Sequence, residues 1–218
     1  MAPTNDKVMR INNEILNILD ANESKKDEKD RKKIRIYLST DQVDKNEPDN
    51  AIDYPPEFLH SLHKSGLPPH ELKLMENCPV MLLRNMNPNA GLCNGTRMLI
   101  TQMGEKVLKC KLLTGERKGK EVLIPKITLT SGEGDFPFKL YRKQFPVKVC
   151  YAMTVNKSQG QTIEFVGIDF TDPIFTHGQA YVAFSRVKSW NCIKVASKPE
   201  KKNKIQNVVW PEALLDEE

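Results

Sequence analysis

The stretch from Ala152 to Thr162, with the sequence AMTVNKSQGQT, constrains the fold more than any other part of this chain. An apolar run from Phe145 to Ala152 leads into it, and a second apolar run from Ile163 to Phe170 follows. Such runs on either side of a polar segment are typical of two strands joined by a turn or a short helix. Loops at the ends of strands in an α/β sheet are where ligands bind. We therefore expect an α/β fold with a ligand site at this turn.

The turn is unusually rich in hydrogen-bonding side chains. Seven polar residues fill nine positions, namely Thr154, Asn156, Lys157, Ser158, Gln159, Gln161 and Thr162. Gly160 lets the backbone come close to a ligand. These groups suit phosphate and ribose oxygens. Taken alone, the stretch is equally compatible with a polar loop that binds nothing.

A second cluster, HGQAYVAFSRV, runs from His177 to Val187. Its apolar residues recur at helical spacing, which predicts a helix with one buried face; they are Ala180, Ala183, Phe184 and Val187. An arginine near a helix end is usually a solvated charge. Here Arg186 follows a helix of small residues, which leaves its guanidinium room to reach a phosphate.

The first seventy residues predict two short helices and one strand. Residues 5 to 20 have apolar side chains at helical spacing, with Asn5 as the expected N-cap residue. A mixed charge run at 21–33 indicates a solvated loop or an extension of this helix. We expect a strand at 34–38, a loop at 41–56 and a short helix at 57–64, which Gly66-Leu-Pro-Pro69 ends.

Residues 72 to 144 alternate short apolar runs with turn residues. This spacing predicts a small antiparallel barrel. The runs are 72–74, 80–83, 98–101, 107–113, 121–124 and 127–129. Lysines and arginines scattered over this region favour solubility over a nucleic-acid contact.

Composition narrows the class of protein. The hydrophobic content of 39% is enough for a core, and the net charge of +5 permits a polyanionic partner without requiring one. The sequence has neither an apolar run long enough for a membrane span nor a signal peptide. Its five cysteines are scattered without a CxxC pair, which indicates reduced thiols inside the cell. The four histidines lack metal-ligand spacing with acidic residues, and Met75 and Cys78 fit core packing better than a soft metal site. We therefore expect no metal site.

Taken together, the two clusters resemble motifs V and VI of the PIF-type superfamily-one DNA helicases, which translocate 5′ to 3′ and include the Helitron group. Pro3-Thr-Asn5, with Val8 and Ile11-Asn12, resembles their motif IV region, and the similarity extends over residues 2–195. Further segments match the parts of the family that link these motifs: Tyr37-Leu-Ser39 with Asp41, Gly66-Leu-Pro-Pro69, Pro79 to Asn85, Gly91 to Arg97, Phe136-Pro-Phe138 and Arg142 to Pro146.

The resemblance implies an α/β fold: a second RecA-like helicase domain (2A) with an inserted small SH3-like β-barrel (2B). It places the first part of domain 2A and linking segments at 1–71, the barrel at 72–145, and the rest of domain 2A, with motifs V and VI, at 146–197. A basic linker and a short terminal helix, docked by Trp210 and Leu214, are expected at 198–218.

The resemblance also implies roles for individual residues. Arg186 would be the arginine finger for the γ-phosphate of ATP, and Gln159, Gly160 and Gln161 would line the nucleotide side of the cleft. The expected contacts to the DNA backbone are Thr4, Asn5, Thr154, Asn156, Lys157 and Ser158. Most of the family outside the transposon group has His where this sequence has Asn156, which cannot become charged.

The sequence has no G-x-x-x-x-G-K-[ST] phosphate loop and no acidic pair that would hold magnesium. By resemblance, ATP and Mg²⁺ would be held mainly by a first RecA-like domain that is not in this chain. We expect that domain and single-stranded DNA as partners, a nuclear location and no membrane. This predicts the C-terminal motor half of a DNA helicase that does not hydrolyse ATP alone. A stand-alone module that binds single-stranded nucleic acid and a transposon-derived relic are the alternatives.

Overall fold

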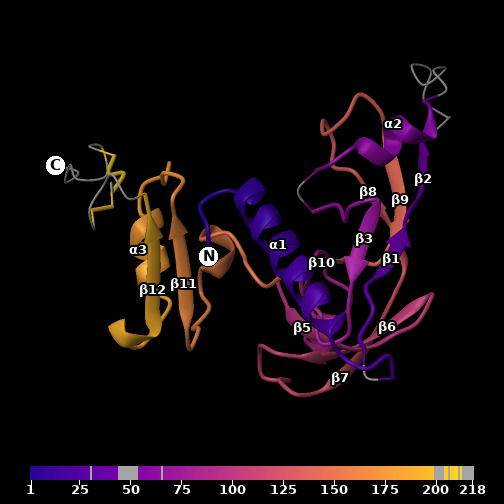
Figure 1. The fold of residues 1–218 in the computed structure, drawn as a ribbon. Coiled ribbons are helices and arrows are strands. Elements are labelled where there is room, and N and C mark those ends of the chain that lie inside the picture. Colours follow the sequence, from indigo (N-terminus) through magenta and orange to yellow (C-terminus); the bar gives the residue numbers. More distant parts are fainter. Residues whose placement is uncertain are drawn as a thin grey trace. The chain divides into compact units, whose positions relative to one another are not determined.

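The computed structural model describes residues 1–29, 31–43, 54–64, 66–198, 204–205, 207–210 and 212. The chain divides into two compact units, each described by itself here (Figure 1). Unit 1 consists of Met1–Asn17 and Tyr151–Glu218, and unit 2 is Ile18–Cys150. None of the described helices is both long and apolar enough to cross a membrane.

Unit 1 begins with helix α1 (Asn5–Glu23), within which the boundary to unit 2 falls. Its buried residues, Val8, Asn12 and Leu16, are four apart and so lie on one face. The Thr4 hydroxyl accepts a hydrogen bond from Lys7 N at 3.3 Å, so Thr4 is the N-cap residue. The prediction that Asn5 is the N-cap residue was wrong. Thr4 takes this role because the first turn already begins at Asn5.

A parallel strand pair forms the centre of unit 1. Strand β11 (Val166–Phe170) pairs in parallel with β12 (Ile193–Ser197), and α3 (Gln179–Phe184) lies between them in the sequence. Figure 1 shows the two strands side by side with α3 next to β12. An apolar core connects these elements, and it consists of the following buried residues: Val155, Val166, Ile168, Phe170, Ile174, Ala180 and Ala183. The first residues of the chain lie along β11, because Met1 O accepts from Asp169 N, and Ala2 forms an isolated parallel bridge with Thr154.

Unit 2 is dominated by a five-stranded antiparallel sheet in the order β10-β4-β5-β6-β7. Alternate residues of β6, namely Leu108, Cys110 and Leu112, are buried, as a sheet with one covered face requires. The strands are β4 (Pro79–Leu82), β5 (Arg97–Met103), β6 (Val107–Leu112), β7 (Glu121–Pro125) and β10 (Val147–Val149).

Two smaller antiparallel sheets complete the described part of unit 2. One has the order β2-β9-β8 and the other pairs β1 with β3. Their strands are β1 (Arg35–Leu38), β2 (Thr40–Val43), β3 (Glu71–Leu74), β8 (Ile127–Thr130) and β9 (Leu140–Gln144). Helix α2 (Pro56–Ser61) packs Leu59 into a second cluster with Leu129, Phe138 and Leu140.

The sequence predicted most of these elements. The expected loop at 41–56 begins in strand β2, whose sequence TDQV has little apolar character. Strands β9 and β12 were also missed. The expected terminal helix falls largely outside the described residues, Leu214 included, although Trp210 N donates to His177 Nδ1 at 3.1 Å.

Candidate nucleotide and nucleic-acid interface

The motif V loop, Ala152–Thr162, is held in shape by two of its own hydroxyls. It contains the 3₁₀ turn η2 (Asn156–Ser158). Ser158 is fully buried and donates from Oγ to Val155 O at 2.6 Å. Thr154 is also buried, and its Oγ1 accepts from Lys157 N at 3.4 Å. Of the expected DNA contacts, these two hydroxyls therefore lie inside the loop.

Five residues of the same loop are exposed: Asn156, Lys157, Gln159, Gly160 and Thr162. Gly160 has φ 77°, a left-handed conformation that favours glycine, and a Cβ placed there would meet no atom within 4 Å. The loop therefore presents two amides, one ammonium group, one threonine and bare backbone to its surroundings. Such groups can donate hydrogen bonds to phosphate oxygens.

Gln161 turns back onto the loop. Its Nε2 donates to Lys157 O at 3.0 Å, and its backbone N donates to Ser158 O at 3.0 Å. Its Oε1 is buried and accepts no hydrogen bond from the described residues. Because buried acceptors are normally hydrogen-bonded, Gln161 Oε1 is able to accept from a further donor.

Arg186 connects the motif VI segment, His177–Val187, to the motif V loop. It lies just beyond α3, and its Nε donates to Val182 O at 2.9 Å. Its Nη1 points to Ser158 O and Gln161 O at 3.5 and 3.4 Å, and Nη2 donates to Ser185 Oγ at 2.7 Å. Arg186 O also accepts from Ile163 N at 2.8 Å. The guanidinium therefore lies in contact with the motif V loop and does not extend away from it.

The motif IV region lies at the same place. Ala2 pairs with Thr154, and Ala2 N donates to Met153 O at 3.2 Å. Thr4 is partly buried and caps α1, whereas the side chain of Asn5 is exposed. The structure thus brings the predicted residues of motifs IV, V and VI together in unit 1.

Three supporting residues were given no role in the sequence analysis. Gln179, only 2% exposed, accepts from Phe175 N at 3.2 Å and donates to Pro3 O at 3.4 Å, which ties α3 to the motif IV region. Asn12 exchanges two hydrogen bonds with the backbone of Ala152, at 2.8 and 3.3 Å. The only signal for either was an amide at a position that helical spacing places on a buried face.

Lys7 is the third supporting residue. Its Nζ lies 3.4 Å from Asp169 and donates to Thr171 Oγ1 at 2.6 Å. Burial alone would raise the pKa of Asp169, but hydrogen bonds from Thr171 and the ammonium of Lys7 outweigh it and lower that pKa. Asp169 is therefore a charged anchor for the start of α1.

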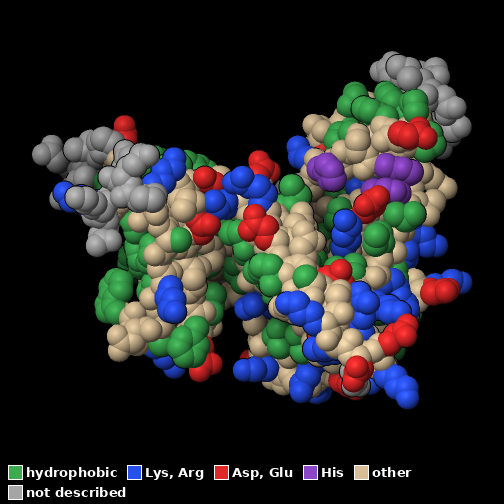
Figure 2. Space-filling view, viewed as in Figure 1, with side chains coloured by type: hydrophobic (Ala, Val, Ile, Leu, Met, Phe, Trp, Pro, Cys, Tyr) green, Lys and Arg blue, Asp and Glu red, His purple; other side chains and the backbone are tan. Residues whose placement is uncertain are grey.

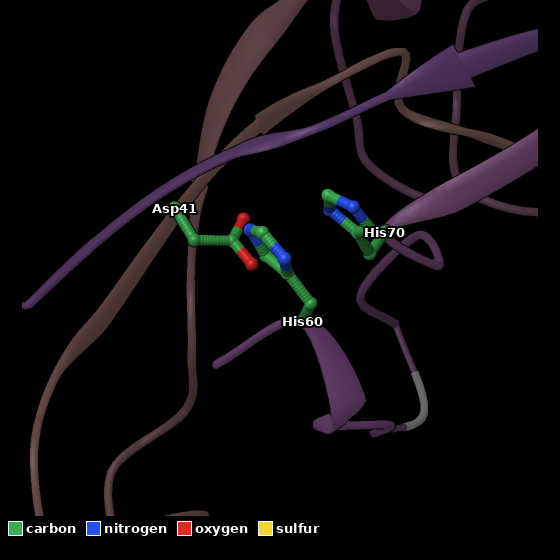
Figure 3. Close-up of side chains that lie close together, drawn as sticks. All are labelled: Asp41, His60 and His70. Atoms are coloured by element: carbon green, nitrogen blue, oxygen red, sulfur yellow. The ribbon is translucent and has the colours of Figure 1, made fainter. Parts of the chain in front are cut away.

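Unit 2 holds a group of side chains of the types that bind metals. Asp41, His60 and His70 lie with one potential ligand atom each within 4.8 Å of one another (Figure 3). They are far apart in the sequence, so spacing along the chain gave no sign of them. Burial and the neighbouring His60 lower the pKa of His70, which favours its neutral form.

Comparison with known families gives two matches along the chain. A family described as "DNA helicase Pif1, 2B domain" matches residues 57–103, and one described as helicase matches residues 142–215. The ATP-dependent DNA helicase PIF1 of Homo sapiens is 30% identical over 148 residues, which cover 66% of this chain and 22% of that protein. The Pif1 of Bdellovibrio bacteriovorus is 30% identical over 131 residues, covering 60% of this chain and 28% of that protein.

Solved structures show the same fold. The Pif1 helicase from Candida albicans superposes with a TM-score of 0.61 at 24% identity, covering 88% of this chain and 43% of that one. A Bacteroides Pif1 in complex with ADP-AlF3 and ssDNA gives 0.59 at 20% identity, covering 91% of this chain and 39% of that one. These likenesses confirm the predicted fold class. The chain spans about a fifth of the length of the vertebrate helicases it matches.

Proposed function

The chain belongs to the PIF1-type superfamily-one DNA helicases and matches only part of their length, and on this basis we propose that it is the C-terminal motor part of such an enzyme. In this proposal a first RecA-like domain holds ATP and Mg²⁺. This chain binds single-stranded DNA at the motif V loop and supplies Arg186 to the nucleotide. The observation that carries the proposal is the contact of Arg186 with Ser158 O and Gln161 O, which joins the two motifs.

The hydrogen bonds of Arg186 suit a side chain that changes partner. Its two Nη1 contacts, at 3.5 and 3.4 Å, are longer than the 2.7–3.2 Å of ordinary hydrogen bonds and are therefore weak. Ser158 O also accepts from Gln161 N at 3.0 Å, so it keeps a partner if the guanidinium leaves. A phosphate carries the charge opposite to that of the guanidinium and can accept two parallel N–H bonds from it, which a backbone carbonyl cannot. A γ-phosphate within reach would thus draw the guanidinium away from the loop.

The same contacts suggest how DNA affects the nucleotide. Lys157 is exposed, and its backbone O accepts from the Gln161 side chain at 3.0 Å. A phosphate bound at Asn156 and Lys157 would shift this turn and, with it, the carbonyls that hold Arg186. We assign Asn156, Lys157 and the exposed Asn5 to direct DNA contact. Thr154, Ser158 and Thr4 support the loop and the helix.

The DNA contact is tested by fluorescence anisotropy with a labelled single-stranded oligonucleotide at increasing salt. Each phosphate contact contributes about 0.7 to the slope of log affinity against log salt for single strands. We expect Lys157→Ala to weaken binding and to reduce the slope by about 0.7. The control Lys194→Ala removes an exposed charge from β12 and should leave the slope unchanged. An unchanged slope in Lys157→Ala would exclude this contact.

The division of labour is tested by joining the chain to the first RecA-like domain of a PIF1 helicase. The chain alone should show no ATP turnover, and the joined protein should hydrolyse ATP when DNA is added. Turnover by the chain alone would contradict the proposal. DNA binding with no turnover in the joined protein would favour the stand-alone binding module instead.

A further inference from the structure

The histidine cluster in unit 2 is assembled from three separate segments. Asp41 comes from β2, His60 from α2, and His70 from the residue just before β3. His60 and His70 are partly exposed, while the side chain of Asp41 is 1% exposed. Figure 2 shows histidine side chains below the hydrophobic surface around α2. A small ion would therefore enter the site from solvent on the side of the two histidines. It is independent of the function proposed for unit 1.

Arg142 holds the carboxylate of Asp41 in place. Its Nε donates to Oδ1 at 2.9 Å and to Oδ2 at 3.1 Å, and its Nη2 donates to Oδ2 at 2.7 Å. Ser39 Oγ donates to Oδ1 at 2.8 Å. Arg142 Nε has one hydrogen, which is shared between the two oxygens, so three hydrogens serve the four or so lone-pair sites of the carboxylate and leave about one for a further partner. The carboxylate of Asp41 is therefore held in one orientation and can still bind a cation.

Ser39 determines which nitrogen of His70 is available. Its Oγ lies 2.8 Å from His70 Nδ1 as well as from Asp41 Oδ1. The hydroxyl has one proton, and it donates this proton in a hydrogen bond to the carboxylate, because a carboxylate can only accept. Ser39 Oγ must then accept from His70 Nδ1–H, so the lone pair of His70 is on Nε2. A histidine whose other nitrogen donates to a neighbouring group is the usual arrangement of a metal ligand.

The two imidazole rings are stacked on each other. Their ring centroids are 3.6 Å apart with an interplanar angle of 12°. Parallel rings place their lone pairs side by side, so one ring must turn before both nitrogens can bind one ion. Rotation about the second side-chain torsion of histidine is broad and roughly two-fold.

We propose that His60, His70 and Asp41 form a site for one Zn²⁺ ion, with water as the fourth ligand. Two imidazoles and one carboxylate are a ligand set that zinc prefers, in tetrahedral geometry, while Mg²⁺ prefers oxygen ligands. The ion links α2 to β2 and to the residue that leads into β3. In this site, bonds from His60 and His70 to the zinc ion would replace the stacking contact between the two imidazole rings.

The test uses the full chain without a polyhistidine tag, treated with EDTA and then freed of it. Zn²⁺ is titrated by calorimetry, and Co²⁺ by its visible absorption, which reports tetrahedral geometry. We expect one equivalent of either ion, with no cobalt–thiolate band from the cysteines and no binding of Mg²⁺. Failure of the parent protein to bind zinc overturns the proposal.

Variants locate the ion. Loss of a supporting hydrogen bond costs roughly 10- to 100-fold in metal affinity, so Ser39→Ala should weaken zinc binding by that factor. His60→Ala and His70→Ala, which remove ligands, should weaken it by more than about 100-fold. His63→Ala is the matched control, since it removes an exposed histidine three residues from His60 and should bind as the parent does. Circular dichroism checks that each variant is folded. Equal affinity in folded His60→Ala and His63→Ala overturns the proposal.

Discussion

Removing Arg142 should destabilise unit 2 far more than removing an exposed charge. Its side chain is 0% exposed and that of its partner Asp41 is 1% exposed. Beyond Asp41, the guanidinium donates to three backbone carbonyls at 2.8 to 3.1 Å, those of Leu59, Leu62 and Pro68. One side chain therefore joins β9, β2, α2 and the segment before β3. Arg142→Met keeps most of the volume and removes all of these bonds.

The expected magnitude follows from the burial of the pair. Breaking a buried ion pair by removing one partner costs about 3–5 kcal/mol, because the other charge stays buried without compensation. The control is Lys109→Met, which breaks the Lys109–Glu121 pair at 2.9 Å with side chains 35% and 55% exposed. An exposed pair contributes up to about 1 kcal/mol. The double variant Arg142→Met with Asp41→Leu should recover part of the loss, since it removes the stranded charge.

Hydrogen exchange of peptides from β9 and α2 measures this loss within unit 2. Both tryptophans, Trp190 and Trp210, are in unit 1, so their fluorescence during urea unfolding is an internal reference. We expect the exchange free energy of unit 2 to fall while the tryptophan transition stays in place. A loss in Arg142→Met no larger than in Lys109→Met would refute the reasoning.

Three further predictions concern stability. Thr4→Ala removes the N-cap of α1 and should cost about 1 kcal/mol in the tryptophan-monitored transition, while Asn5→Ala should cost little; the reverse order would contradict the cap assignment. Gly160→Ala places a side chain at φ 77° and should cost about 1–2 kcal/mol through backbone strain alone, because nothing lies within 4 Å of the new methyl group; an unchanged urea midpoint would contradict this. Because the pKa of His70 is lowered in the folded protein, the unfolded chain binds the proton more readily, so in EDTA the free energy of unfolding should fall as pH falls below about 6.5. His70→Gln should flatten this dependence and His63→Gln should not.

The sequence was informative wherever apolar residues followed the period of an element. Helix α1 and strand β6 are examples, since their buried residues repeat every four or every two positions. Strand β9 shows the limit. Its inward positions are Leu140, Arg142 and Gln144, so two polar side chains point to the interior. Their partners lie far away in the sequence; Gln144, for example, donates to Tyr37 O and His70 O. Periodicity cannot reveal such contacts.

The candidate site shows a similar division. The polar composition of the motif V loop and the resemblance to known motifs selected the loop and Arg186. They could not separate Ser158, which is fully buried, from its exposed neighbours Asn156 and Lys157. That difference arises because the turn η2 points the side chain of Ser158 inward and leaves those of Asn156 and Lys157 exposed. Gln179 was missed because its partners, Phe175 N and Pro3 O, are backbone groups brought together only by the fold.

The role of Arg186 is tested most directly by single-turnover ATP hydrolysis in the protein joined to a first RecA-like domain, with saturating DNA. An arginine finger contributes roughly 10³- to 10⁵-fold to the rate, so Arg186→Ala should lose activity by that factor while it still binds ATP. Lys188→Ala, which removes an exposed charge two residues away, should keep the parent rate. A rate in Arg186→Ala equal to that of Lys188→Ala would contradict the account.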